Sequence, residues 1–80
     1  MRRSIYVIMH QLEYIRKHIF GVTQVTFAEI AETTQASVSR WESGEQYPDH
    51  AEMARIRAAA RKRSIPWNDQ WFFELPVEVA

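Results

Sequence analysis

Two short apolar patterns, joined by a link of three residues, constrain the fold of this chain more than any other feature. Thr23 and Thr34 each precede one pattern, and threonine caps a helix by accepting a hydrogen bond from a backbone N–H of the first turn. The residues expected to be buried behind these caps are Phe27, Ala28, Ala31, Val38 and Trp41. Because Ala28 is small, the two helices can approach closely, and the larger apolar side chains then set their angle. The sequence therefore predicts two packed helices, the second of which projects from the surface.

Two longer segments carry helical patterns on either side of this pair. A stripe of apolar residues at spacings of three and four predicts an amphipathic helix over 10–20, and Gly21 can end it. The members of that stripe are Leu12, Ile15 and Ile19. After a loop from Gly44 through Pro48, Asp49 begins a second helix that ends near Arg63. The apolar face of this helix contains Met53, Ile56 and Ala60.

The two ends of the chain are patterned differently. Residues 4–9 are largely β-branched or aromatic, which favours a short strand. In the aromatic C-terminal segment, 64–80, a short fifth helix can start at Pro66 or Trp67. We therefore expect a single domain over 1–80 of the mainly all-α class, with four to five helices, a core within about residues 10–63 and room for a short N-terminal strand.

The charges are balanced in number but segregated along the chain. Ten Lys and Arg residues stand against ten Asp and Glu residues, so the basic excess typical of nucleic-acid binders is missing. Acidic residues dominate between Thr23 and Glu52, where the one basic residue apart from a histidine is Arg40. Basic residues cluster later, at Arg55, Arg57, Arg61, Lys62 and Arg63. This cluster can bind phosphate, but a solvated helix end is the favoured interpretation, because cations also suit the helix dipole there.

Several classes of function lack the residues that they need. The chain has no cysteine, and His10, His18 and His50 are spaced too irregularly for a metal site on one helix. Neither a Ser-His-Asp arrangement nor a glycine-rich phosphate loop can be built from the sequence, so we expect no enzyme, no cofactor and no metal. No apolar run approaches the roughly 20 residues that span a bilayer, so no membrane partner is expected and a cytoplasmic location is the default.

A set of residues in one register gives the helix pair a more specific interpretation. The set consists of Gln24, Phe27-Ala28, Val38, Trp41-Glu42 and Gly44. This pattern, read without a gap from Thr23 to Gly44, resembles the Cro and lambda-repressor type of helix-turn-helix transcriptional regulators. The resemblance extends from the helix that contains Leu12 to about Arg63. It implies a lambda-repressor-like fold that places the second helix of the pair in the major groove of DNA.

The resemblance also implies roles for individual residues. Base contacts fall to Gln35, Ala36, Ser39 and Arg40 on the exposed face of the second helix. Their chemistry suits that task, since Arg pairs with guanine, Gln with adenine, and Ala meets a thymine methyl. Phosphate contacts fall to Gln24, Thr34 and Ser37, near helix N-termini whose dipoles add positive potential that a charge count omits.

Other positions support the helix pair or depart from the family pattern. Ala28, Val38 and Trp41 pack the two helices together, and the resemblance implies a basic–acidic pair between Lys17 and Glu42. Glu32 stands where the family usually has glycine, and a left-handed backbone there would cost a non-glycine residue about 1 kcal/mol or more. Ile30 stands where a polar residue is usual, which suggests contact with another element.

The two ends of the chain also have functional interpretations. Trp71, Phe72 and Phe73, with Trp67, exceed the core that a small domain normally needs, so they predict a homodimer interface, although about half of them can be core instead. A two-fold symmetric dimer would bind a palindromic operator. Arg2-Arg3 can form an arm that reaches a minor groove or simply a soluble terminus.

The main interpretation is a DNA-binding repressor or activator that has no separate ligand domain. Three alternatives to it remain open. The chain can be a protein-interaction module, such as an antirepressor or antiactivator, which its neutral charge and Ile30 slightly favour. It can be a DNA-binding antitoxin whose aromatic segment engages a toxin. A bare helical bundle is the simplest alternative, but packing alone does not explain the whole register from Gln24 to Gly44.

Overall fold

The computed structural model describes residues 9–75, and every regular element within them is helical. The first helix begins as α1 (Gln11–Tyr14) and continues as the π-helix η2 (Ile15–Phe20). It is followed by α2 (Gln24–Ala31), α3 (Gln35–Ser43), α4 (His50–Lys62) and the 3₁₀ helix η3 (Asp69–Phe72). The all-α class and the order of the helices are thus as the sequence predicts. The arm expected at Arg2-Arg3 lies outside the described residues, and so does the strand expected at 4–9 except for its last residue.

Side-chain caps begin the helices where the sequence places them. The hydroxyl of Thr23 accepts a hydrogen bond from the Thr26 N–H at 3.1 Å, and the hydroxyl of Thr34 accepts one from the Ser37 N–H at 3.0 Å. At the start of α4, Asp49 and Glu52 form a reciprocal capping box, which satisfies two backbone donors at once. These caps explain why the predicted starts of α2, α3 and α4 are correct.

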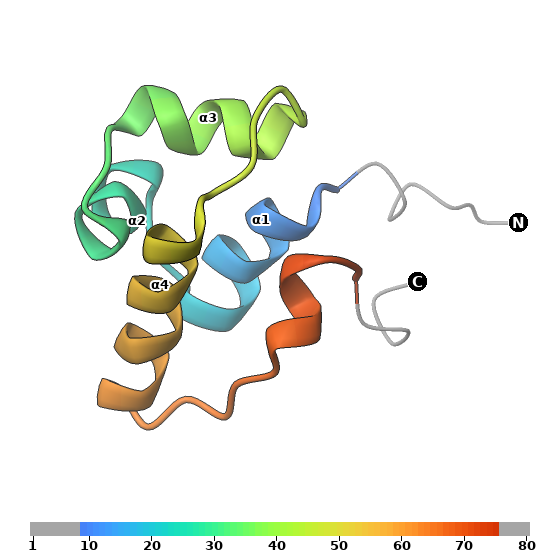
Figure 1. Ribbon diagram of the computed structural model, residues 1–80. Coiled ribbons are helices and arrows are strands. Elements are labelled where there is room, and N and C mark those ends of the chain that lie inside the picture. Colours follow the sequence, from blue (N-terminus) through green and yellow to red (C-terminus); the bar gives the residue numbers. More distant parts are fainter. Residues whose placement is uncertain (1–8, 76–80) are drawn as a thin grey trace, which may run out of the picture.

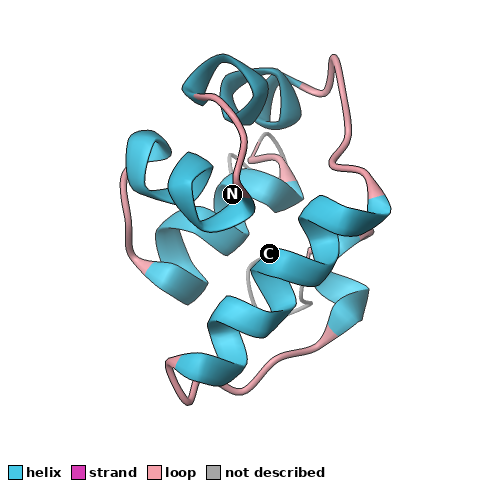
Figure 2. Cartoon of the chain, turned by 60° about the vertical axis from the view of Figure 1, so that its left-hand side comes forward, coloured by secondary structure: helices cyan, strands magenta, loops and turns pink. Residues whose placement is uncertain are grey.

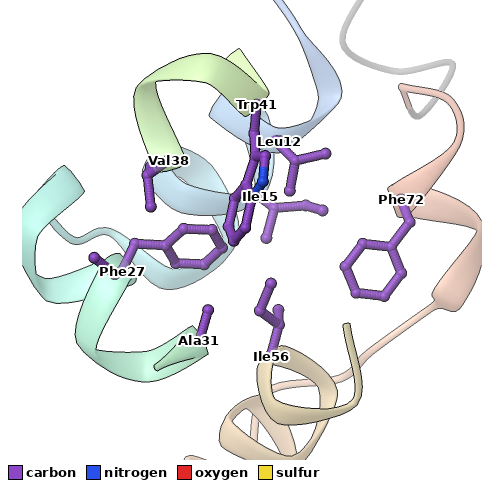
Figure 3. Packing of buried hydrophobic residues seen from close by; sticks show 9 residues of the cluster. Leu12, Ile15, Phe27, Ala31, Val38, Trp41, Ile56 and Phe72 are labelled. Carbon is purple, nitrogen blue, oxygen red and sulfur yellow. The ribbon is translucent and has the colours of Figure 1, made fainter. Parts of the chain in front are cut away.

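One core joins all the helices (Figure 1, Figure 2). Figure 3 shows that Phe27 and Trp41 lie beside Ile15 at its centre, with Val38 near Phe27 and Ile56 below them. The buried side chains expected in α2 and α3 are all in this cluster, whereas Met53 of α4 is only partly buried. Ile30, which the sequence suggested would contact another element, packs against the same cluster from α2.

The C-terminal segment contributes to the core through a shorter and later element than the sequence predicts. Pro66 and Trp67 are not helical, and η3 begins only after Asn68, whose side chain accepts a hydrogen bond from the Gln70 N–H. Arg57 of α4 holds this segment by a salt bridge with Asp69, in which Arg57 Nη1 lies 2.7 Å from Asp69 Oδ2. The assignment of Phe72 to a dimer interface is wrong, because its side chain is 2% exposed and lies within the core (Figure 3).

The turn between α2 and α3 takes the left-handed conformation that the sequence makes unfavourable. Glu32 has φ 58° and ψ 52°, in the region that normally favours glycine. Arg55 of α4 supports this turn, because its guanidinium donates to the Ala31 carbonyl at 2.9 Å and pairs with the Glu32 carboxylate at 3.3 Å. Arg55 therefore supports the fold and does not belong to a merely solvated helix end. The same holds for Arg57, which pairs with Asp69.

Replacing Glu32 with glycine is expected to stabilise the protein by about 0.5–1 kcal/mol, because relief of the left-handed strain exceeds the loss of an exposed ion pair. Urea unfolding of both proteins measures this difference. The matched control is Glu29→Gly in the helical part of α2, which should destabilise by about 1 kcal/mol. A lower unfolding midpoint for Glu32→Gly than for the parent would contradict the prediction.

Candidate nucleic-acid interface

The projecting surface of the molecule is the outer face of α3. Helix α3 lies at one end of the molecule, with the remaining helices on one side of it (Figure 1). Val38 and Trp41 point inward and are buried. The four side chains predicted to contact bases are all exposed and follow one another at the spacing of a single helical face: Gln35, Ala36, Ser39 and Arg40. The structure thus brings the predicted base-contacting residues together on an accessible surface.

Arg40 gives this face its positive charge. Its side chain is exposed, and among the described residues it forms no salt bridge. An unpaired guanidinium on a projecting helix is available for bidentate hydrogen bonds to a planar acceptor pair. The face therefore offers the guanidinium N–H donors of Arg40. Beside them lie the amide of Gln35, the hydroxyl of Ser39 and the methyl group of Ala36.

A largely buried ion pair holds α3 against the first helix. Arg16 Nε lies 2.5 Å from Glu42 Oε2, and Arg16 Nη2 donates to Glu42 Oε1 at 3.0 Å, so the pair is bidentate. The two side chains are only 11% and 10% exposed. Arg16 also donates to the Val22 carbonyl in the link between η2 and α2, so one guanidinium binds both this link and the carboxylate of Glu42. This hydrogen bonding with Glu42 raises the pKa of Arg16, although burial acts in the opposite direction.

The assignment of Lys17 as the partner of Glu42 is wrong. Lys17 pairs with Glu13, one turn earlier on the solvent side of its own helix, at 2.8 Å. Arg16 follows Leu12 by four residues and therefore shares the buried face of the helix, as the spacing alone could have indicated. Arg16 is thus the partner of Glu42 that the resemblance missed.

Hydrogen bonds continue from this ion pair to the exposed face. The amide nitrogen of Gln24 donates to Glu42 Oε1 at 3.0 Å, and its amide oxygen accepts from the Gln35 side chain at 3.3 Å. The side chain of Gln35 is thus oriented by Gln24 of α2, which is itself held by Glu42 of α3. Gln24, expected to contact phosphate, has a second role as a support for a predicted base-contacting residue.

The N-terminus of α3 offers backbone donors beside this chain of side chains. The amides of Gln35 and Ala36 precede the first intrahelical hydrogen bond, which Val38 donates to the Thr34 carbonyl. Thr34 and Ser37 lie at the same end, where their hydroxyls are 3.1 Å apart. The Thr34 hydroxyl accepts the capping hydrogen bond and donates its own proton to Ser37, so an anion would compete with Ser37 for that proton.

His10 belongs to the framework behind this interface. Its Nδ1 accepts a hydrogen bond from the Leu12 N–H and so caps α1, and its ring packs edge-on against Tyr47. Burial lowers the pKa of His10, while the carboxylates of Glu42 and Glu13 partly oppose that shift. A neutral ring is the form that can accept the capping hydrogen bond.

Neither a metal cluster nor a membrane-spanning helix is found in the described part of the chain. Within residues 9–75, no three His, Asp or Glu side chains gather as ligands for a metal ion. None of the helices described there is long and apolar enough to cross a bilayer. In comparisons with known proteins, no family model, no curated protein and no solved structure matches this chain.

Proposed function

We propose that this protein is a sequence-specific DNA-binding transcriptional regulator with a lambda-repressor-like helix-turn-helix, and that α3 enters the major groove. The observation that carries the proposal is the outer face of α3, where Gln35, Ala36, Ser39 and Arg40 are exposed together on a helix that projects from the core. An α-helix fits the major groove of B-DNA, and these side chains match the groups that base edges present there.

The orientation of Gln35 supports a specific contact. One amide hydrogen of Gln35 is directed to Gln24, so its second amide hydrogen and its oxygen are left for DNA. Adenine presents an acceptor at N7 and a donor at N6, and these two groups complement the remaining hydrogen and oxygen. Gln35 therefore reads adenine in this proposal, and Arg40 reads guanine.

Backbone contacts complete the proposed binding mode. The first amides of α3 and the side chains of Gln24, Thr34 and Ser37 contact phosphates around the recognition helix. A helix N-terminus attracts anions without adding to the net charge, which reconciles DNA binding with ten basic and ten acidic residues.

The protein acts as a homodimer on a palindromic operator in this proposal. Phe73 is 60% exposed and Tyr47 is 44% exposed, and both are linked to Gln11, whose amide donates to the Tyr47 hydroxyl and to the Phe73 carbonyl. Exposed aromatic side chains are typical of interfaces between proteins. Partly buried Trp71 packs against the core and would contribute less to the interface than Phe73.

The proposal is tested by selecting an operator from random duplexes and titrating it with Arg40→Ala. If Arg40 pairs with guanine, its removal should abolish discrimination at one position of each half-site, a loss of about 1–3 kcal/mol of specificity. Operators changed one base pair at a time measure that loss. Gln24→Ala should lower general affinity and also weaken the preference for adenine, because Gln24 orients Gln35.

Arg61→Ala is the matched control, since Arg61 is exposed near the end of α4 that points away from α3 (Figure 1). It should leave the base preference unchanged. Full base preference in Arg40→Ala would show that the recognition helix is assigned wrongly. Absence of salt-dependent DNA binding by the parent would instead favour the protein-interaction module over both the regulator and a DNA-binding antitoxin.

A further inference from the structure

A second surface lies between the end of α2 and the C-terminal half of α4. It is an open groove whose apolar lining consists of Ile30, Ala58 and Ala59. Its basic lining consists of Arg55, Lys62 and Arg63, and Glu32 contributes one carboxylate. None of these residues belongs to the proposed DNA-contacting face of α3.

The charges of this groove are only partly compensated. Arg55 pairs with Glu32, whereas Lys62 and Arg63 form no salt bridge within residues 9–75. Arg63 is held in place, because its guanidinium lies 5.7 Å from the centre of the Phe20 ring and approaches the Ala59 carbonyl. The groove therefore keeps uncompensated positive charge at Lys62 and Arg63, and contacts with Phe20 and Ala59 hold the guanidinium of Arg63 in place.

The apolar lining limits what can fit there. Phosphates would be attracted by the cations, but they would gain nothing from Ile30, Ala58 and Ala59. The C-terminal end of α4, beside which Lys62 and Arg63 lie, points away from α3, although the groove also reaches Glu32 in the turn before α3 (Figure 1). An occupant that matches both features must offer carboxylates beside an apolar stripe.

We infer that this groove binds an acidic amphipathic helix of a partner protein. The small side chains of Ala58 and Ala59 let another backbone approach α4 closely, as helix-on-helix packing requires. The partner's apolar stripe covers Ile30 and the alanines, and its Glu or Asp residues face Lys62 and Arg63. This inference does not depend on DNA binding by α3.

The experiment is an NMR titration of the isotope-labelled protein with a synthetic helical peptide of about 15 residues, long enough to form a helix. The peptide carries leucines at spacings of three and four, flanked by glutamates. A second peptide of the same pattern has glutamine in place of each glutamate. We expect saturable shifts of the Ile30, Ala58 and Ala59 amides with the first peptide and binding at least about fivefold weaker with the second.

Two pairs of variants localise the interaction. Ala58→Glu places a carboxylate in the groove and should weaken peptide binding about tenfold, whereas Ala54→Glu, at an exposed position of α4 outside this groove, should change it less than about twofold. Lys62→Ala should weaken binding about threefold, whereas Arg61→Ala, with the same loss of charge outside the groove, should have little effect.

The inference is overturned if neither peptide binds at millimolar concentration, or if the two peptides bind equally well. It is also overturned if Ala58→Glu and Lys62→Ala leave peptide binding intact. Tighter binding of duplex DNA or of anionic lipid vesicles through Lys62 would assign the groove to a different class of partner. Because α3 is untouched in these variants, operator binding by them distinguishes failure of this inference from failure of the proposed function.

Discussion

Glu42→Ala is expected to destabilise the protein by about 3–5 kcal/mol, because it leaves the guanidinium of a nearly buried Arg16 without its partner. The same substitution removes the acceptor of the Gln24 amide, so the orientation of Gln35 should also be lost. Chemical denaturation measures the first effect, and discrimination for adenine in a DNA titration measures the second. A loss of stability together with a loss of discrimination for adenine would show that the Arg16–Glu42 pair supports both the fold and the orientation of Gln35 on α3.

A double-mutant cycle separates the ion pair from the rest of this effect. Arg16→Met with Glu42→Leu should give a coupling energy of a few kcal/mol, because each single change leaves a largely buried charge unpaired. The control is Lys17→Ala, which removes an exposed pair with Glu13 and should cost less than about 0.5 kcal/mol. Coupling between Lys17 and Glu42, with none between Arg16 and Glu42, would reverse the assignment made from the structure.

Phe72→Ala is expected to destabilise the protein by about 3–5 kcal/mol, whereas the adjacent Phe73→Ala should cost less than about 0.5 kcal/mol. The reason is burial, since Phe72 is 2% exposed within the core and Phe73 is 60% exposed. Removal of Phe72 leaves a cavity beside Trp67, whose ring centre is 5.2 Å from that of Phe72. Thermal and urea unfolding of the two variants measure the difference.

The same two variants distinguish core from interface. If Phe73 belongs to the proposed homodimer interface, Phe73→Ala should shift the monomer–dimer equilibrium toward monomer in sedimentation experiments while the fold stays intact. A parent chain that remains monomeric at tens of micromolar would rule out a dimer of ordinary affinity. Equal stability losses in Phe72→Ala and Phe73→Ala would contradict the different burial of the two rings.

Local patterns in the sequence were sufficient for the helix starts and for most buried positions. Thr23, Thr34 and Asp49 were identified as caps because capping depends on residues within the first turn. Phe27, Val38 and Trp41 were identified as core because helical periodicity alone separates their face from the exposed one. The left-handed turn at Glu32 was implied by the resemblance to the Cro and lambda-repressor type, which usually has glycine at that position.

Only the tertiary structure decided which distant residues meet. Helical spacing alone places Arg16 on the buried face, but it does not name the partner of Arg16. Packing decides that Arg16 binds Glu42 and that Arg55 supports the turn at Ala31, because it brings together side chains that lie far apart in the sequence. The segment after α4 shows the same limit. Two adjacent phenylalanines have equal local preferences, and Phe72 is buried only because η3 turns its ring toward Ile56 and the first helix (Figure 3). Phe73, the next residue, stays 60% exposed.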